Sequence, residues 1–207
     1  MWRRSWLVPV TVACLLPATA SSQSIGIYID NGATVCTAEV GSTPLIDMHV
    51  IAILGGDVTG LTGAQFWISG APDTWQQKNV FWVPDPAATF NVGNPIFHTS
   101  LGDGRPGVVL TFNTCRGDGI PEGDGGRVEL GRLIIAGAPT PREVHLKVEH
   151  FELVPTDPEC PTMLECQSPA FPQVCVAGGE AVLNGTGPCG VVAVTQRTWS
   201  EVKALFR

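Results

Sequence analysis

The sequence predicts an all-β protein, a sandwich or barrel of about nine short strands. Apolar residues alternate with a period of two along most of the chain, which is typical of half-buried strands. The 207 residues include 24 glycines and 17 prolines, which favour tight turns over helices. Six cysteines follow the first twenty residues, and an even number in an exported chain indicates disulfides that hold the strands together.

Residues 1–20 are predicted to be a signal peptide. Two arginines precede an apolar run at 6–16, and residues 18–20 form a small-residue cleavage site. The run is shorter than a transmembrane helix, which needs about 20 residues. A lipoprotein signal at Cys14 is the alternative. We therefore expect a secreted protein, extracellular or periplasmic after cleavage, with no membrane span.

The chain that would remain after cleavage is acidic. It has ten basic and nineteen acidic residues, which gives a net charge of −9. Such a surface repels nucleic acids and anionic lipids, so neither is an expected partner.

The segment at 44–54 is the clearest strand. One of its faces is wholly apolar and is predicted to be buried. That face comprises Ile46, Met48, Val50, Ala52 and Leu54. The opposite face comprises Leu45, Asp47, His49, Ile51 and Ile53.

Similar alternation predicts further strands through residues 21–184, separated by turn signals such as Asn31-Gly32. The pattern slips by one residue near Glu149-His150 and near Gly131-Arg132, where we expect β-bulges. The other predicted strands lie at 25–30, 33–40, 63–69, 79–83, 107–115, 128–135, 144–154 and 173–184.

The order of these segments resembles the cohesin domain of cellulosomes and its carbohydrate-binding-module relatives. The motifs are "DMHVIAIL" followed by "GLTGAQFWISG", then "VELGRLIIAG", "VHLKVEHFELV" and a final "GGEAVLNG". The resemblance covers about residues 25–184 and implies a nine-stranded jelly-roll sandwich. It carries over no binding residues. The whole chain also resembles exported proteins of environmental bacteria that end in a similar tail.

The six cysteines are predicted to form three disulfides, although the sequence leaves their pairing open. Cys160 and Cys166 flank a short loop and could close locally, while Cys189 could tie the tail to the body. Zinc spacing is absent, because no Cys-x2-Cys pair occurs. The six are Cys36, Cys115, Cys160, Cys166, Cys175 and Cys189.

Three tryptophans are the candidate binding residues. Trp67 lies opposite the apolar face of its strand, and Phe81 and Trp82 point to opposite faces of theirs. With Trp75, these rings could stack on sugars or contact a protein, and the alternative is that they pack inside the sandwich.

The glycine-rich segment at 116–126 is the candidate metal site. Asp118, Glu122 and Asp124 could supply oxygen ligands to calcium, and a solvated acidic loop is the alternative. No other cofactor is expected.

Catalytic motifs are absent from the sequence. It has no His-Glu-x-x-His pair, no Gly-x-Ser-x-Gly elbow and no P-loop. The four histidines are interpreted as ordinary strand or loop residues. The protein is therefore not expected to be an enzyme.

The C-terminal segment 198–207 is predicted to be an amphipathic helix after a linker at 185–197. Thr198 and Glu201 form a capping box. A helix so short does not persist alone, so we expect it to dock on the sandwich or on a partner. Its apolar stripe comprises Trp199, Val202, Leu205 and Phe206.

These features favour a secreted, non-catalytic binding or structural module that recognises carbohydrate or another extracellular protein. The alternatives are a secreted hydrolase and a subunit of a surface layer or filament.

Overall fold

The protein is all-β. The computed structural model describes residues 23–41, 44–55, 58, 60–98, 106–117, 126–151, 159–166, 172–186 and 191–192. These residues form thirteen strands and no helix, which confirms the predicted fold class. The strands are β1 (Ser24–Tyr28), β2 (Thr37–Ala38), β3 (Leu45–Ile53), β4 (Leu61–Ser69), β5 (Val80–Pro84), β6 (Ala88–His98), β7 (Pro106–Arg116), β8 (Arg127–Ala136), β9 (Val144–Glu149), β10 (Thr162–Glu165), β11 (Gln173–Cys175), β12 (Ala177–Leu183) and β13 (Val191–Val192).

The predicted signal peptide at 1–20 and the predicted helix at 198–207 lie outside the described residues, as does most of the linker at 185–197. Within the described part of the chain, no helix is long and apolar enough to cross a membrane.

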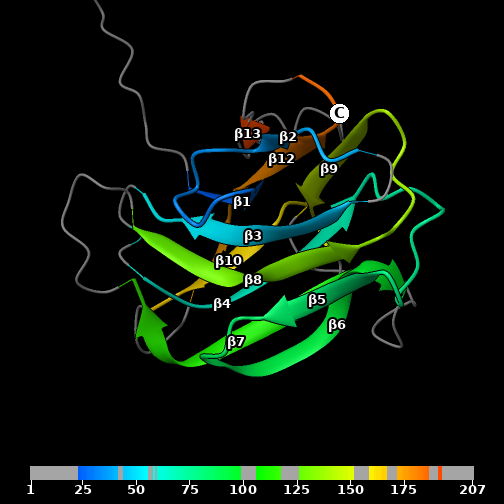
Figure 1. Ribbon diagram of the computed structural model, residues 1–207. Coiled ribbons are helices and arrows are strands. Elements are labelled where there is room, and N and C mark those ends of the chain that lie inside the picture. The colour runs from blue at the N-terminus through cyan, green and yellow to red at the C-terminus, as the bar shows by residue number, and fades with distance from the viewer. Residues whose placement is uncertain are drawn as a thin grey trace, which may run out of the picture.

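The strands form a two-layered sandwich. Hydrogen bonds join them in the order β11-β10-β4-β9-β12-β1-β3-β8-β5, while β7 pairs with β4 and β6 pairs with β7. Strand β12 links the layers, because it pairs in parallel with β1 and antiparallel with β9. Figure 1 shows β1, β3, β8 and β5 side by side as one layer, with β4 behind it.

A contact between two aromatic rings demonstrates that the sheet folds over on itself. Phe66 on β4 and Trp82 on β5 meet edge to face, with their ring centroids 6.0 Å apart. The two strands are six steps apart in the sheet order. In a flat sheet that separation would be about 30 Å. The rings therefore meet across the interior, between the two layers.

The core follows the predicted alternation. Met48, Val50 and Ala52 of β3 are buried, and Ala64 and Phe66 of β4, from the other layer, are buried in the same core cluster. The predicted slip at Gly131-Arg132 is confirmed, since the β3–β8 register shifts between Val50 and Ile51, opposite that segment.

Other boundaries differ from the predictions. The bulge predicted near Glu149-His150 is wrong, because β9 ends at Glu149 and Phe151 is buried beyond the strand end. The segment 173–184 divides into β11 and β12. Strand β6 was not predicted, because Gly93 and Pro95 interrupt its pattern.

Two disulfides have both partners among the described residues. Cys115 pairs with Cys166, and Cys160 pairs with Cys175. The local closure of Cys160 on Cys166, which the sequence left open as one possibility, does not form. The segment between them is not a loop but strand β10, which extends between β4 and β11 and carries the two cysteines apart.

Cys36 is also disulfide-bonded, while Cys189 lies outside the described residues. Disulfides persist in oxidising compartments, so these bonds fit an exported protein.

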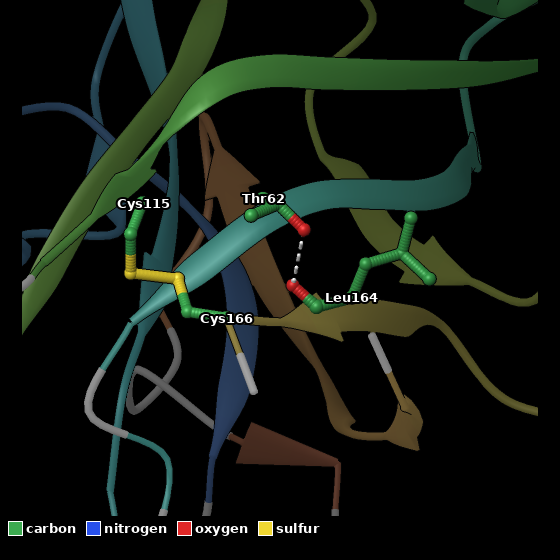
Figure 2. The surroundings of a disulfide bond; sticks show 4 residues. All are labelled: Thr62, Cys115, Leu164 and Cys166. Atoms are coloured by element: carbon green, nitrogen blue, oxygen red, sulfur yellow. Dashed lines mark hydrogen bonds between the residues drawn. A yellow bond between two sulfur atoms is a disulfide. The ribbon is translucent and has the colours of Figure 1, made fainter. Parts of the chain in front are cut away.

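The Cys115–Cys166 bond closes over the start of β4 (Figure 2). Strands β7 and β10 flank β4, so their residues would be about 10 Å apart, more than a disulfide spans. The two Cα atoms are only 5.6 Å apart because the pairing is irregular here: the β4–β7 register shifts between Leu61 and Gly63, and the bond lies beside Gly60. A Cβ on Gly60 would lie 2.9 Å from the Arg116 carbonyl oxygen and 3.0 Å from Cys166 Sγ. Glycine is therefore required there.

Candidate functional site

The outer face of β3, β8 and β5 is the candidate site. The inward side chains of these strands, such as Met48, Leu133 and Val80, are fully or almost fully buried. Their neighbours in sequence must therefore point to the opposite side of the layer. We refer to this surface as the β3–β8–β5 face. It comprises Leu45, Asp47, His49, Arg132, Ile134, Ala136, Phe81 and Val83.

Apolar residues run across the face in register. Ile134 of β8 pairs with Phe81 of β5 on one side and with Asp47 of β3 on the other. Leu45 pairs with Ala136 in the adjacent row. Leu45 is 83% exposed and Phe81 is 43% exposed, so both side chains present apolar surface to solvent. Among the described residues, only two other large hydrophobic side chains are exposed, those of Val35 and Phe90.

One ion pair and one histidine–carboxylate hydrogen bond border the apolar residues. Arg132 Nη1 donates to Asp47 Oδ2 at 2.7 Å, and both side chains are about two-fifths exposed. His49 Nδ1 lies 2.9 Å from Glu129 Oε1. The Arg132 and Asp47 charges are matched locally, so a partner that covers the face does not leave that ion pair uncompensated.

The face is held rigidly. Strands β3 and β8 pair from Leu45 to Ile53, and β8 pairs with the whole of β5. The face is bounded at β1 by a separate small cluster, in which Tyr28, Cys36 and Ile51 are buried under the loop that follows β1. The open surface therefore begins at His49, which pairs with Tyr28.

A second polar cluster lies on the outer side of β9 and β12. His145 Nε2 is 2.9 Å from Glu143 Oε1, and its Nδ1 contacts Glu180. Lys147 Nζ is 3.8 Å from the other oxygen of Glu180. Hydrogen bonds to Glu180 and then to Glu143 raise the pKa of His145 above its ordinary value. Sequence reasoning missed this cluster, because Glu180 reaches His145 only through strand pairing.

The three predicted tryptophans are not gathered at one site. Trp75 is only 4% exposed, and its Nε1 donates to the Pro139 carbonyl at 3.2 Å. Trp82 points inward, packs on Phe66 and donates to Asn91. Trp67 lies on the outer side of β4 and is half-buried, paired with Glu149.

The remaining predicted residues lie outside the described part of the chain. These are the acidic residues Asp118, Glu122 and Asp124 and the tail residues Trp199, Val202, Leu205 and Phe206. Among the described residues, no group of three or more histidine, cysteine, aspartate or glutamate side chains is arranged to hold a metal ion.

Three solved structures similar to this chain are cohesins. A cohesin module from a family 33 glycoside hydrolase of Clostridium perfringens has a TM-score of 0.41 and 7% identity, over 79% of this chain and 97% of that one. A type II cohesin domain from the cellulosome of Acetivibrio cellulolyticus has a TM-score of 0.40 and 12% identity, over 79% and 95%. The seventh ScaB type I cohesin of Pseudobacteroides cellulosolvens has a TM-score of 0.35 and 9% identity, over 82% and 96%. Neither a protein-family model nor a curated protein matches the sequence.

Proposed function

We propose that this chain is an extracellular, non-catalytic module that binds another protein through the β3–β8–β5 face. The observation that carries the proposal is the exposure of Leu45 and Phe81 on either side of Ile134, on strands that are fixed by continuous pairing. An apolar centre with a charged border is the usual composition of a protein–protein interface.

A protein partner accounts for this face better than a sugar does. Sugar binding on a flat sheet relies on exposed aromatic rings, with polar groups around them. Phe81 is the one aromatic residue of the face, and the other large apolar residues there, Ile134, Leu45 and Val83, are aliphatic. Aliphatic side chains make good contacts with other apolar side chains and cannot hydrogen-bond to sugar hydroxyls.

The rigidity of the face favours binding in a second way. A surface whose backbone is already ordered loses little conformational entropy when a partner docks. The Asp47–Arg132 pair would then set the orientation of the partner, because charged groups contribute specificity more than affinity.

The test is capture of a partner from the extracellular fraction of the organism that makes the chain. A captured protein is then purified, and its Kd is measured against the wild type and two variants. Ile134→Asp places a charge at the centre of the face. Phe90→Ser is the matched control, because Phe90 is 51% exposed on β6, away from the face.

We expect Ile134→Asp to weaken binding by at least about thirtyfold, the loss typical of a central interface residue. Phe90→Ser should bind like the wild type. Both variants should stay folded, with a slightly lower melting temperature for Ile134→Asp because position 134 pairs with Asp47. Equal binding by all three proteins would refute the assignment to this face. Concentration-dependent light scattering by the wild type alone, abolished by Ile134→Asp, would instead identify a second copy as the partner.

A further inference from the structure

The chain contains two Asn-Gly dipeptides, Asn31-Gly32 and Asn184-Gly185. This dipeptide can modify itself. The backbone nitrogen of the glycine attacks the side-chain carbonyl carbon of the asparagine, an N–C bond forms and ammonia leaves. Water then opens the cyclic imide to aspartate or isoaspartate. Glycine favours the attack because it has no Cβ to hinder the approach.

The structure holds the side chain of Asn184 in place with four hydrogen bonds. Its Oδ1 accepts from the backbone nitrogens of Val40 at 2.7 Å and Gly41 at 3.0 Å. Its Nδ2 donates to the carbonyl oxygens of Gly41 at 2.9 Å and Pro141 at 3.1 Å. The carboxamide must leave all four partners before its carbon can be attacked.

The backbone of Asn184 is fixed as well. Its nitrogen donates to the Ala38 carbonyl at 2.8 Å, and its φ of 54° is in the left-handed region. Gly185 also lies beside Glu143, since a Cβ added to it would be only 2.7 Å from Glu143 Oε1.

Asn31 lies in a different environment. It is an exposed central residue of the turn that the Ala33 nitrogen closes by donating to the Asp30 carbonyl at 3.3 Å. The turn is held by the Asp30 carboxylate, which accepts from the Thr34 and Val35 nitrogens. Among the described residues, no hydrogen bond involves the Asn31 side chain, so its carboxamide is free to rotate toward the Gly32 nitrogen.

We propose that Asn31 is a site of spontaneous deamidation in the folded protein and that the fold protects Asn184 from the same reaction. The reaction needs water and no other reactant. It places a second carboxylate beside Asp30, and the isoaspartate product also adds one carbon to the backbone of the turn. That turn leads to Cys36 and covers Tyr28 and Ile51, next to the β3–β8–β5 face.

The test is peptide mapping by mass spectrometry after incubation of the full chain in mildly alkaline buffer. In the folded protein we expect deamidation at Asn31, and a rate at Asn184 at least about a hundredfold lower, because four hydrogen bonds must open together. In urea with a reductant, both sites should react at comparable rates. The unfolded chain is thus the internal control for intrinsic reactivity.

Asn31→Gln should abolish the modification of the folded protein, because a glutamine would have to close a larger ring. The proposal is overturned if folded Asn184 reacts as fast as Asn31. It is also overturned if Asn31 stays intact in the folded protein while it reacts in the unfolded chain.

Discussion

Arg132 donates to Asp47 across the β3–β8 pair, although neither residue is the other's register partner. Asp47 pairs with Ile134, and Arg132 pairs with His49, so the ion pair is diagonal. The ion pair lies at the border of the apolar residues of the β3–β8–β5 face. Because both side chains are about two-fifths exposed, the pair contributes little to stability and is available to a partner.

Charge reversal at this pair should separate binding from stability. Asp47→Arg and Arg132→Asp should each lower the free energy of unfolding by less than about 1 kcal/mol, the usual contribution of an exposed pair. Each should weaken partner binding, and the double exchange should recover the ion pair in the opposite orientation. Urea denaturation and titration calorimetry measure the two quantities. If the single variants unfold far more easily than the wild type, the pair is structural.

The contact between Phe66 and Trp82 should be essential for the stability of the sandwich. Phe66→Ala removes a fully buried ring from between the layers, so we expect the free energy of unfolding to fall by about 3–5 kcal/mol. Phe81→Ala, next to Trp82 in sequence but 43% exposed, is the control and should lose less than about 1 kcal/mol. Similar losses for both would contradict the assignment of Trp82 to the interior and Phe81 to the surface.

The two described disulfides should contribute different amounts to the free energy of unfolding. The Cys115–Cys166 bond joins residues 51 apart in sequence, and the Cys160–Cys175 bond joins residues 15 apart. In the chain-entropy description, the longer closure stabilises by about 4 kcal/mol and the shorter by about 3 kcal/mol. Paired alanine variants, compared by chemical denaturation, should rank in that order. A larger loss from removal of Cys160–Cys175 would indicate that the native edge strand β11 depends on its bond.

Gly60 should tolerate no side chain. Gly60→Ala would place a Cβ against the Cys115–Cys166 bond and within 2.9 Å of the Arg116 carbonyl oxygen. We expect a loss of about 1–3 kcal/mol, as for an overpacked core site. Gly41→Ala is a useful contrast, because nothing lies within 4 Å of its Cβ position and any loss there arises from its φ of 72°. The melting temperature of a Gly60→Ala variant that also lacks both cysteines should show how much of the loss comes from the bond.

The cluster around His145 should make stability depend on pH. Its pKa is raised above the ordinary 6.5, because it bonds to Glu180 and Glu143. The folded state therefore binds the proton more tightly than the unfolded chain. The contribution is fully present below pH 6.5 and is lost as the pH rises through the folded-state pKa. His145→Gln should remove this dependence. Unfolding curves at a series of pH values should then show a difference in the free energy of unfolding between wild type and variant that disappears at high pH.

Alternation along single strands predicts which residues of the candidate site share a face, although the candidate binding residues from the sequence were Trp67, Trp75 and Trp82 instead. The sequence places Leu45, Asp47 and His49 on the face of their strand opposite Met48 and Val50, and the structure agrees. It also predicts that Phe81 and Trp82 point to opposite sides. A period of two fixes which residues share a face, because successive Cβ atoms alternate. It does not fix which face is covered when both carry apolar residues.

Strand pairing, not alternation, determines which side of each strand faces the interior. Phe81 is outside and Trp82 inside because β5 pairs with β8, with Trp82 opposite the buried Leu133. The same long-range pairing brings Glu180 to His145, and Cys166 to Cys115 across 51 residues.

By itself, the sequence determined that the chain is all-β, where most strands lie and which side chains each strand groups on one face. These properties depend on neighbours along the chain, through the geometry of extended backbone and the conformational limits of glycine and proline. Only the tertiary structure decided the disulfide partners, the exposed face and the protection of Asn184. Each of these depends on residues far apart in sequence, whose encounter is set by the order of the strands in the sheet rather than by any local pattern.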